Sequence, residues 1–542
     1  MNAKPGSKWR AFSAFAGIIS LLPLVAYFLI PSLAARADLA IQHSIPLAGL
    51  WVACTAISWG FAIWWLRAGI QRVEKIAKKL TRASRIERNK KTDIRQIENF
   101  LPSDKKRFDP LKYVNPAKGV FLGLSEENNS IYITKGDWET DHLLTTGRTR
   151  SGKGVASQIL GTQSIRLGEL FVVLDPKCDN WMPHIFFNAC KEAGKPYHFL
   201  DLRQSAHPQI NLFDGCSEEV IENMFLAAFS LAEKGDNADF YRLGDRKAAR
   251  QAAGFITKNP GVTPLQVLDN FREEWTENAA GFAAALAEMA ELPSVNRRSG
   301  GIDIEALART GGCLYVVGDM LNTRIIRMQR MLLMRLMLLA KNRDQLADHR
   351  IIRVLADEFR VHISRPFIVG LAAAAGWRLL VILAMQSFED LRDCPADLDQ
   401  DMVRGAVIEN CALQLSYRIK DHNTAELLAM TTGEILVDDE SRQIERNVAL
   451  AETVSGMRSV RQADRYLVDV NMIKSLPVPD PDKKTIGCGV LVGASKLAQF
   501  CFTSPIQVER TRQAITPTTS QPAQSELQYS VEDKIAKIES LE

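Results

Sequence analysis

A glycine-rich loop places the strongest constraint on the fold of this chain. Residues 147–154 read Gly-Arg-Thr-Arg-Ser-Gly-Lys-Gly, directly after the apolar run Leu143–Thr146 and before a helix-compatible stretch. In a strand–loop–helix unit, glycines let backbone N–H groups surround a β-phosphate, and the lysine reaches the β and γ oxygens. The loop therefore predicts ATP binding. The residues predicted to contact the nucleotide are Gly147, Arg148, Thr149, Arg150, Ser151, Gly152, Lys153, Gly154 and Val155.

A magnesium site is expected beside this loop. Gly154 departs from the usual pattern, because a Ser or Thr hydroxyl normally binds Mg²⁺ at that position. The apolar run Ile351–Ala356 is followed by Asp357 and Glu358. Carboxylates at such a strand end hold the metal and polarise the attacking water. We predict that Asp357 organises Mg²⁺ and that Glu358 is the general base.

Two further polar residues follow strand-like runs. Gln386 ends the run Leu379–Met385, and it is expected to sense the γ-phosphate or to position water. Arg418 follows another such run, where it is either an arginine finger that reaches a neighbouring subunit's nucleotide or a surface salt-bridge residue. With Lys153 and the acidic pair, Gln386 and Arg418 complete the predicted catalytic set. Asp175-Pro-Lys177 also closes a strand, but spacing alone gives it no role.

Alternating elements on either side of a helical stretch predict an α/β fold. Apolar strand-like runs alternate with helical stretches, which favours a largely parallel sheet covered by helices. The candidate strands are Phe171–Leu174, Cys313–Val317, Ile351–Ala356 and Leu379–Ala384. Strand signals are missing between 211 and 308, so an all-α insertion is expected there. Its candidate helices are Glu218–Glu233, Asp239–Thr257, Thr263–Glu273 and Ala279–Leu292.

Two apolar runs near the N-terminus predict transmembrane helices. Ala11–Ala35 has no charged residue, and Ile41–Leu66 has none except a usually neutral histidine. Each is long enough for a hydrocarbon core about 30 Å thick. A signal peptide is the alternative for the first run, but that run is long and a second follows at once. Basic residues flank the pair, so both termini and the body are expected in the cytoplasm.

The charge distribution is uneven. The formal net charge is +4, yet the segment 67–112 carries fifteen basic and six acidic residues. Attraction to anionic lipid headgroups is one interpretation of this segment, and contact with nucleic acid is the other. The nine cysteines are scattered without a CxxC motif, so neither a zinc site nor a disulfide framework is indicated.

These signals predict six segments along the chain. They are a two-helix membrane anchor (1–66), a basic juxtamembrane linker (67–112), the first part of a nucleotide-binding domain (113–210), the all-α domain (211–308), the second part of the nucleotide-binding domain (309–502) and a flexible tail (503–542).

The motifs together resemble the type IV secretion coupling proteins, the TraG/TraD/TrwB-like family of the FtsK/HerA group. The resemblance is carried by the loop, by "VVLDPK" at 172–177, "DEF" at 357–359, "MQS" at 385–387, "YRIKDHNTAELL" from Tyr417, "GVFLG" at 119–123 and the paired apolar runs. Many members have Gly after "DPK", where this chain has Cys178. At the last position of the loop, Gly154 matches one branch of the family rather than the branch that has Ser or Thr there.

The resemblance implies a RecA-like P-loop NTPase in a homo-hexameric ring on the bacterial inner membrane. Such a ring would recruit DNA and a relaxase, or effector proteins. It would use ATP and Mg²⁺ to pass them to the channel ATPases and inner-membrane components of a type IV secretion system. A coupling ATPase that delivers only protein effectors is one alternative, and a membrane receptor that binds nucleotide without turnover is another.

Overall fold

The computed structural model describes residues 87–88, 94–203, 207–233, 235, 238–344, 346–446 and 452–518. These residues belong to two compact units. The larger unit holds those from 94 to 435 and from 464 to 518, and the smaller unit holds 87–88 and the described residues of 436–463.

An eleven-stranded sheet runs through the larger unit, in the order β3-β2-β14-β13-β10-β4-β9-β8-β5-β7-β6. The seven strands from β10 to β6 are parallel, whereas β13, β14, β2 and β3 pair antiparallel. In sequence order the strands are β2 (Val120–Leu124), β3 (Ser130–Ile133), β4 (Leu143–Thr146), β5 (Leu170–Asp175), β6 (Tyr197–Asp201), β7 (Gly312–Val317), β8 (Ile352–Ala356), β9 (Leu379–Met385), β10 (Leu413–Ser416), β13 (Gly487–Val492) and β14 (Gln499–Thr503).

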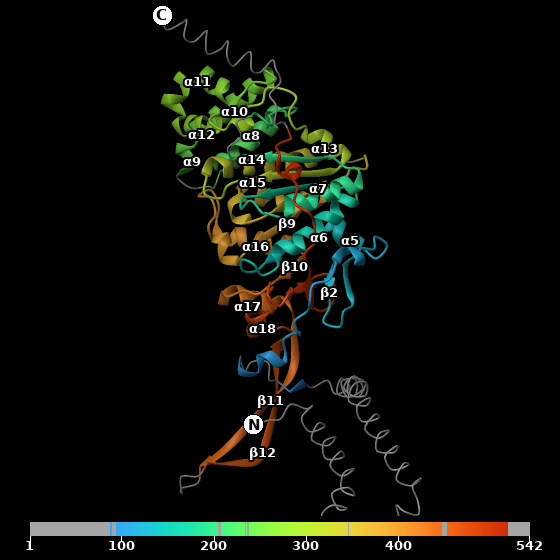
Figure 1. Cartoon of the computed structure of the whole chain (residues 1–542). Coiled ribbons are helices and arrows are strands. Elements are labelled where there is room, and N and C mark those ends of the chain that lie inside the picture. Colours follow the sequence, from blue (N-terminus) through green and yellow to red (C-terminus); the bar gives the residue numbers. More distant parts are fainter. Residues whose placement is uncertain are drawn as a thin grey trace, which may run out of the picture. The chain divides into compact units, whose positions relative to one another are not determined.

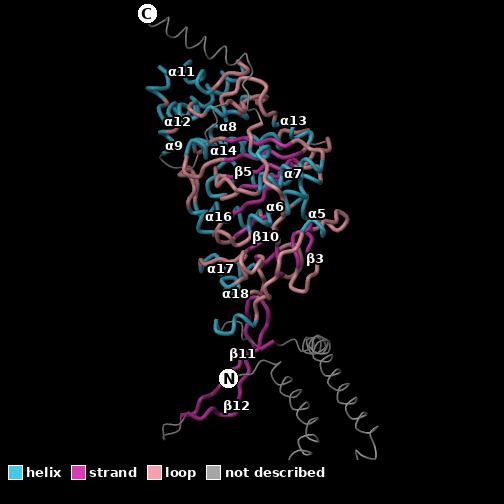
Figure 2. The backbone as a smooth tube through the Cα atoms, in the orientation of Figure 1, coloured by secondary structure: helices cyan, strands magenta, loops and turns pink. Residues whose placement is uncertain are grey.

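Helices cover both faces of the parallel strands, as expected from their continuous apolar sequence. Along β5, Leu170, Val172 and Leu174 enter the core shared with α14 (Thr323–Lys341) and α15 (Arg365–Ala374). Phe171 and Val173 enter the core shared with α6 (Lys153–Arg166) and α7 (Met182–Ala193). The strands run through the middle of this unit in Figure 2. The prediction of a mostly parallel α/β sheet is confirmed.

Outside residues 218–290, the described part of the larger unit also contains nine α-helices and seven 3-10 turns. The helices are α5 (Lys135–Thr140), α6 (Lys153–Arg166), α7 (Met182–Ala193), α13 (Ile304–Thr310), α14 (Thr323–Lys341), α15 (Arg365–Ala374), α16 (Gln400–Asn410), α17 (His422–Thr431) and α18 (Val470–Ser475). The 3-10 turns are η2 (Ile94–Asn99), η3 (Pro110–Tyr113), η4 (Pro293–Val295), η5 (Phe359–His362), η6 (Ala375–Trp377), η7 (Phe388–Arg392) and η8 (Arg512–Ile515).

The stretch between β6 and β7 is helical. Its helices gather at one end of the larger unit in Figure 1, and they are α8 (Glu218–Phe229), α9 (Ala238–Tyr241), α10 (Leu243–Lys258), α11 (Pro264–Asn278) and α12 (Ala280–Ala290). Among the described residues of 211–308, the one extended pairing is an isolated bridge between Asn211 and Asn296. The expectation of an all-helical stretch therefore agrees with these elements.

A second, three-stranded sheet was not expected from the sequence. It has the order β1-β11-β12, with β1 (Glu87–Arg88), β11 (Glu434–Arg446) and β12 (Glu452–Tyr466). Strand β1 pairs with β11 in parallel. Residues 436–463, which lie within the segment 309–502 predicted as the second part of the nucleotide-binding domain, belong to the smaller unit.

Residues 514–518 lie along the edge of the large sheet that is formed by β6. The Tyr197 hydroxyl donates to the carbonyl of Ala514 (2.8 Å). The amide of Phe199 donates to Oγ1 of Thr518 (2.8 Å), and the amide of Thr518 donates back to the Phe199 carbonyl (3.1 Å). This stretch thus covers the free edge of β6. The flexible-tail prediction remains a prediction for 519–542, which lie outside the described residues.

The predicted transmembrane helices also lie outside the described residues. The same holds for residues 67–93 of the basic linker, except 87–88. Within the ranges that the structure describes, no helix combines the length and the apolar character needed to cross a bilayer.

Candidate active site

The sheet order gathers the predicted site residues at one edge. Strand β9 lies between β4 and β8, and all three are parallel, so their carboxyl ends lie side by side. The loop 147–154 follows β4, Asp357 and Glu358 follow β8, and Gln386 follows β9. Ligands of open α/β folds bind at this edge of the sheet.

The loop backbone takes conformations that favour glycine. Gly147 has a φ of 145° and Gly152 a φ of 127°. A Cβ atom on either would lie 2.7 Å from the buried Tyr417 side chain, which follows β10. Glycine therefore serves two purposes at these positions, since it permits the positive φ and the close approach to Tyr417.

Lys153 is the first residue of α6, with Gly152 as its N-cap. Its side chain is 7% exposed, and its ammonium donates to the carbonyl of Gly147. Burial, with a smaller contribution from the nearby Lys177, lowers the pKa of Lys153 to about 8. A cation and a helix N-terminus at the same loop form a phosphate-binding arrangement. The same loop buries Oγ of Ser151 and Nε of Arg148, neither of which has a partner among the described residues.

The acidic pair is held by a lysine and an amide. Lys177 Nζ lies 3.6 Å from Oδ2 of Asp357 and contacts Oε1 of Glu358. Gln386 Nε2 donates to the same Glu358 oxygen (3.1 Å). The other carboxylate oxygen of Glu358, Oε2, is buried and has no partner within the described part of the chain. The Glu358 carboxylate is therefore fixed through one oxygen and has the other available for a water molecule.

The two carboxyl groups have pKa values shifted in opposite directions. Burial raises the pKa of Asp357 to about 6, although Lys177 opposes the shift. For Glu358, burial also disfavours the charge. The hydrogen bond and charge of Lys177 and the hydrogen bond from Gln386 outweigh it, so the pKa of Glu358 lies below its ordinary value. Glu358 is therefore ionised at neutral pH, as a general base must be.

The turn after β8 holds Glu358 in an unusual backbone conformation. Glu358 has φ 47° and ψ 58°, a left-handed conformation that is costly for a residue with a Cβ. His362 Nε2 bonds to the carbonyl of Asp357 (3.1 Å), and Arg330 Nε donates to the carbonyl of Val361 (2.8 Å). Burial lowers the pKa of His362 to about 3, so it stays neutral. These contacts fix the strained turn and the direction of the Glu358 side chain.

Lys177 is the site residue to which the sequence analysis assigned no role. The fully buried carboxylate of Asp175 accepts hydrogen bonds from the amides of Lys177 (2.9 Å), Cys178 (2.9 Å) and Asp179 (2.7 Å). The Tyr315 hydroxyl donates to it as well (2.6 Å). This turn presents Lys177 to the acidic pair because β5 is the neighbour of β8. The sequence signal was the Asp-Pro-Lys that closes β5.

Known proteins resemble this chain in sequence and in fold. No family model matches the chain. The Escherichia coli protein "Mobilization protein A" is 27% identical over 361 residues, which is 66% of each chain and so just under two thirds of that relative. Among solved structures, the unbound bacterial conjugative coupling protein TrwBdeltaN70 has a TM-score of 0.51 at 15% identity, covering 78% of this chain and 95% of that one. The plasmid coupling protein TrwB in complex with ADP and Mg²⁺ has a TM-score of 0.53 at 15% identity, with coverages of 77% and 97%.

This chain has the fold of the conjugative coupling protein TrwB. The expected resemblance to coupling proteins is thereby confirmed at the level of the fold. TrwB has also been solved with the ATP analogue ADPNP, at a TM-score of 0.51 and 15% identity over 75% of this chain and 96% of that one.

The magnesium prediction fits the residues at this edge. In the described part of the chain, no three His, Cys, Asp or Glu side chains gather as a self-sufficient metal site. Nucleotide-bound Mg²⁺ needs only one or two carboxylates besides the phosphates. Asp357, partly buried at the sheet edge beside Lys177, is such a carboxylate. Gly154 lies in the first turn of α6, where it supplies no hydroxyl.

Arg418 contacts the loop through its backbone. Its carbonyl accepts the amide of Arg148 (3.1 Å), while its side-chain Nε donates to the carbonyl of Lys474 (2.9 Å). Within the single chain the guanidinium is therefore directed to the end of α18. The role of Arg418 as an arginine finger, which requires a second subunit, remains a prediction.

The Cys178 departure from the family pattern yields a stability prediction. Cys178 has φ 62°, the conformation for which glycine is favoured. We expect Cys178→Gly to raise the free energy of unfolding by about 1 kcal/mol, because it removes left-handed strain. Cys178→Ala keeps that strain and should give no gain, as measured by urea unfolding. Equal stabilities for the two variants would contradict this account.

The lowered pKa of Lys153 predicts a pH dependence for nucleotide binding. Below about pH 8 the Lys153 ammonium is charged, whereas above it the neutral amine must take up a proton when the phosphates bind. Without Mg²⁺, the affinity for ADP should therefore fall by up to about tenfold per pH unit above pH 8. Isothermal titration calorimetry between pH 7 and 10 measures this slope. Lys153→Arg, whose guanidinium stays charged, should lose the slope; a flat profile for the unaltered chain would refute the prediction.

Proposed function

We propose that this chain is an inner-membrane coupling ATPase. It recruits a DNA–relaxase substrate and uses ATP hydrolysis to deliver that substrate to a type IV secretion channel. The observation that carries the proposal is the convergence of the Lys153 loop with the Lys177–Glu358–Gln386 contacts at one sheet edge. The shared fold with a conjugative coupling protein and the 27% identity to a mobilization protein support the conjugative context.

The arrangement suits hydrolysis rather than binding alone. Lys153 and the N-terminal amides of α6 would bind the phosphates, and Asp357 would hold Mg²⁺, which would supply positive charge against the charge that develops on them. Glu358, held through Oε1 by Lys177 and Gln386, accepts the proton of the attacking water at Oε2. A receptor that binds nucleotide without turnover would have no need of a buried carboxylate fixed in this way.

Membrane anchoring and ring assembly complete the proposal. The two apolar runs of 1–66, with basic residues on either side, support a multi-pass anchor whose termini face the cytoplasm. A homo-hexamer would bring Arg418 of one subunit near the nucleotide of the next. The channel ATPases and inner-membrane components of the secretion system are the proposed partners.

The proposal is tested with the full chain in lipid nanodiscs. ATP hydrolysis is measured without DNA and with single- or double-stranded DNA, at 50 mM and 300 mM salt. We expect stimulation by DNA at low salt that declines at high salt, because phosphate contacts are displaced by counterions. Hydrolysis without stimulation by any DNA at low salt would reject the DNA substrate and leave delivery of protein effectors.

A further inference from the structure

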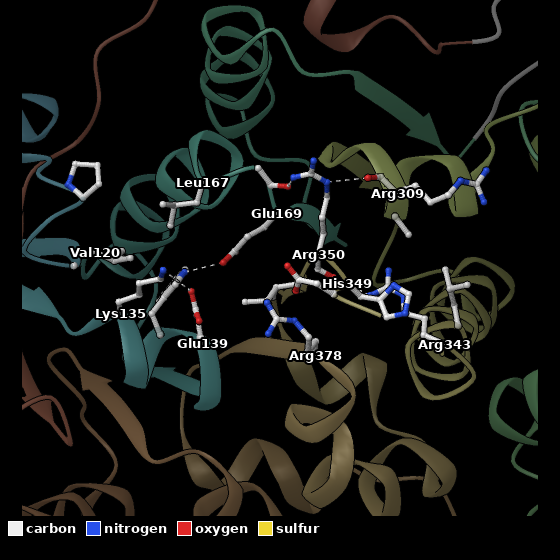
Figure 3. Close-up of a pocket in the computed structure, with 18 of the residues that line it drawn as sticks. Val120, Lys135, Glu139, Leu167, Glu169, Arg309, Arg343, His349, Arg350 and Arg378 are labelled. Carbon is white, nitrogen blue, oxygen red and sulfur yellow. Dashed lines mark hydrogen bonds and ion pairs between the residues drawn. The ribbon is translucent and has the colours of Figure 1, made fainter. Parts of the chain in front are cut away.

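A large cavity opens at the edge of the sheet opposite the candidate active site. It has a volume of about 740 Å³, and its walls include residues that precede the parallel strands β5, β8 and β9, namely Glu169, Ile351 and Arg378. Because these residues stand at the amino-terminal ends of their strands, the cavity is separate from the loop and the acidic pair. Figure 3 shows the charged side chains around it.

Most carboxylates of the cavity wall are already neutralised by a paired cation. The pairs are Glu139 with Lys135 (3.7 Å), Glu305 with Arg309 (3.8 Å) and Glu169 with the buried Arg353 (2.8 Å). This leaves Arg343, Arg350 and Arg378 against the single carboxylate of Asp348. Counted together with Arg353, which pairs with Glu169 but does not itself line the cavity, the described wall residues therefore have an excess of two positive charges.

The three arginines come from separate segments, and two of them donate to neutral carbonyl groups. Arg343, just after α14, donates to the carbonyl of Arg350 (2.8 Å). Arg350, in the loop before β8, donates to the carbonyls of Arg309 (2.8 Å) and Gly168 (3.1 Å). Nε of Arg378 is buried and has no partner within the described ranges. Carbonyl oxygens accept these hydrogen bonds but leave the guanidinium charges uncompensated.

Arg343 is the clearest sign of this imbalance. Burial lowers its pKa, and the charged neighbour that lowers it further is Arg378, another cation. Two guanidinium groups that face one cavity repel each other. Such a pair is stabilised by an anion that accepts hydrogen bonds from both.

Arg378 also occupies a backbone position that is costly for it. Its φ of 60° and ψ of 32° place it in the left-handed region, at the end of η6 and before β9. Glycine would adopt this conformation without strain. Strained residues retained at a cavity are frequently functional. The strain at Arg378 and the uncompensated charge are independent observations on the same side chain.

We propose that this cavity is a binding site for a phosphate group. Planar guanidinium groups bind phosphate oxygens in pairs, and the volume is sufficient for a nucleotide-sized ligand. Arg343 and Arg378 are its principal ligands. Arg350 also lines the cavity, and its carbonyl accepts a hydrogen bond from Arg343. The phosphate belongs either to a small molecule or to a nucleic-acid backbone.

The test uses the full chain with the loop inactivated by Lys153→Ala, so that binding at the opposite edge is measured alone. The probes are sodium pyrophosphate and a single-stranded oligodeoxynucleotide, titrated calorimetrically at constant chloride. In this background Arg378→Gly removes the guanidinium while relieving the backbone strain, so the fold should be retained. Arg343→Ala is the second variant. Arg404→Ala, which removes a surface arginine paired with Asp401, is the matched control.

We expect saturable binding of at least one probe, at least tenfold weaker in Arg378→Gly and in Arg343→Ala but unchanged in Arg404→Ala. Loss of pyrophosphate binding identifies a small phosphate ligand, and loss confined to the oligonucleotide identifies a nucleic-acid backbone. If both probes bind the two cavity variants as they bind the control, the proposal is wrong. It is also overturned if neither probe binds, or if binding is found only after the chain self-associates.

Discussion

Glu358→Gln is expected to abolish ATP hydrolysis while leaving nucleotide binding intact. The substitution keeps the size of the side chain and removes the carboxylate whose Oε2 has no partner among the described residues. General-base catalysis contributes roughly 100- to 10,000-fold to a rate, so kcat should fall within that range. Affinity for ADP should change by less than about threefold, because Lys153 and the loop remain. A steady-state hydrolysis assay and calorimetric titration measure the two quantities.

A neighbouring carboxylate supplies the control. Glu389, on η7, pairs with Arg392 (2.8 Å), and within the described residues it forms no hydrogen bond or ion pair with the acidic pair. Glu389→Gln should retain full hydrolysis. The comparison with Lys153→Ala then separates a motor from a receptor in the cell. A motor loses substrate transfer in both Lys153→Ala and Glu358→Gln, whereas a nucleotide-binding receptor loses it only in Lys153→Ala and would contradict the proposed function.

The parallel core could be predicted because its strands are buried on both faces. Phe171–Leu174 and Cys313–Val317 are continuous apolar runs, and they lie within β5 and β7. Tyr197–Asp201 was missed because it forms the edge strand β6 and mixes polar with apolar residues. Its edge is covered by residues up to Thr518, which polar composition alone had assigned to a flexible tail.

The motifs of the site could be predicted from the sequence, but the residues that contact them in the fold, Lys177 and Tyr417, could not. The loop and the acidic pair follow recognisable strands, and each lies in a local sequence pattern. Lys177 contacts Glu358 because β5 and β8 pair, although the whole helical stretch and β7 lie between them in the sequence. Tyr417 reaches the loop for the same reason, since β10 pairs with β4. Strand order of this kind depends on long-range packing, which local spacing does not encode.

Gly152→Ala is expected to abolish nucleotide binding without unfolding the chain. A Cβ at this position would lie 2.7 Å from Cε1 of Tyr417, and the φ of 127° disfavours any side chain. Tyr417 cannot move aside easily, because it is fully buried and its hydroxyl is hydrogen-bonded to Oγ1 of Thr503 (2.7 Å). The loop must therefore open, which displaces the amides and Lys153. Calorimetry should show ADP affinity weakened at least roughly 100-fold, equivalent to about 3 kcal/mol.

Gly154→Ala is the matched control, since it makes the same change two residues later. A Cβ on Gly154 would meet Met182 Cε at 3.7 Å, an ordinary contact, and the position is helical. Alanine there should stabilise α6 by up to about 1 kcal/mol and keep ADP affinity within about threefold. Similar affinities in the two variants would show that the Tyr417 contact does not shape the loop. A loss in Gly154→Ala alone would mean that this glycine is required by the bound nucleotide, because packing in the free chain leaves room for the methyl group.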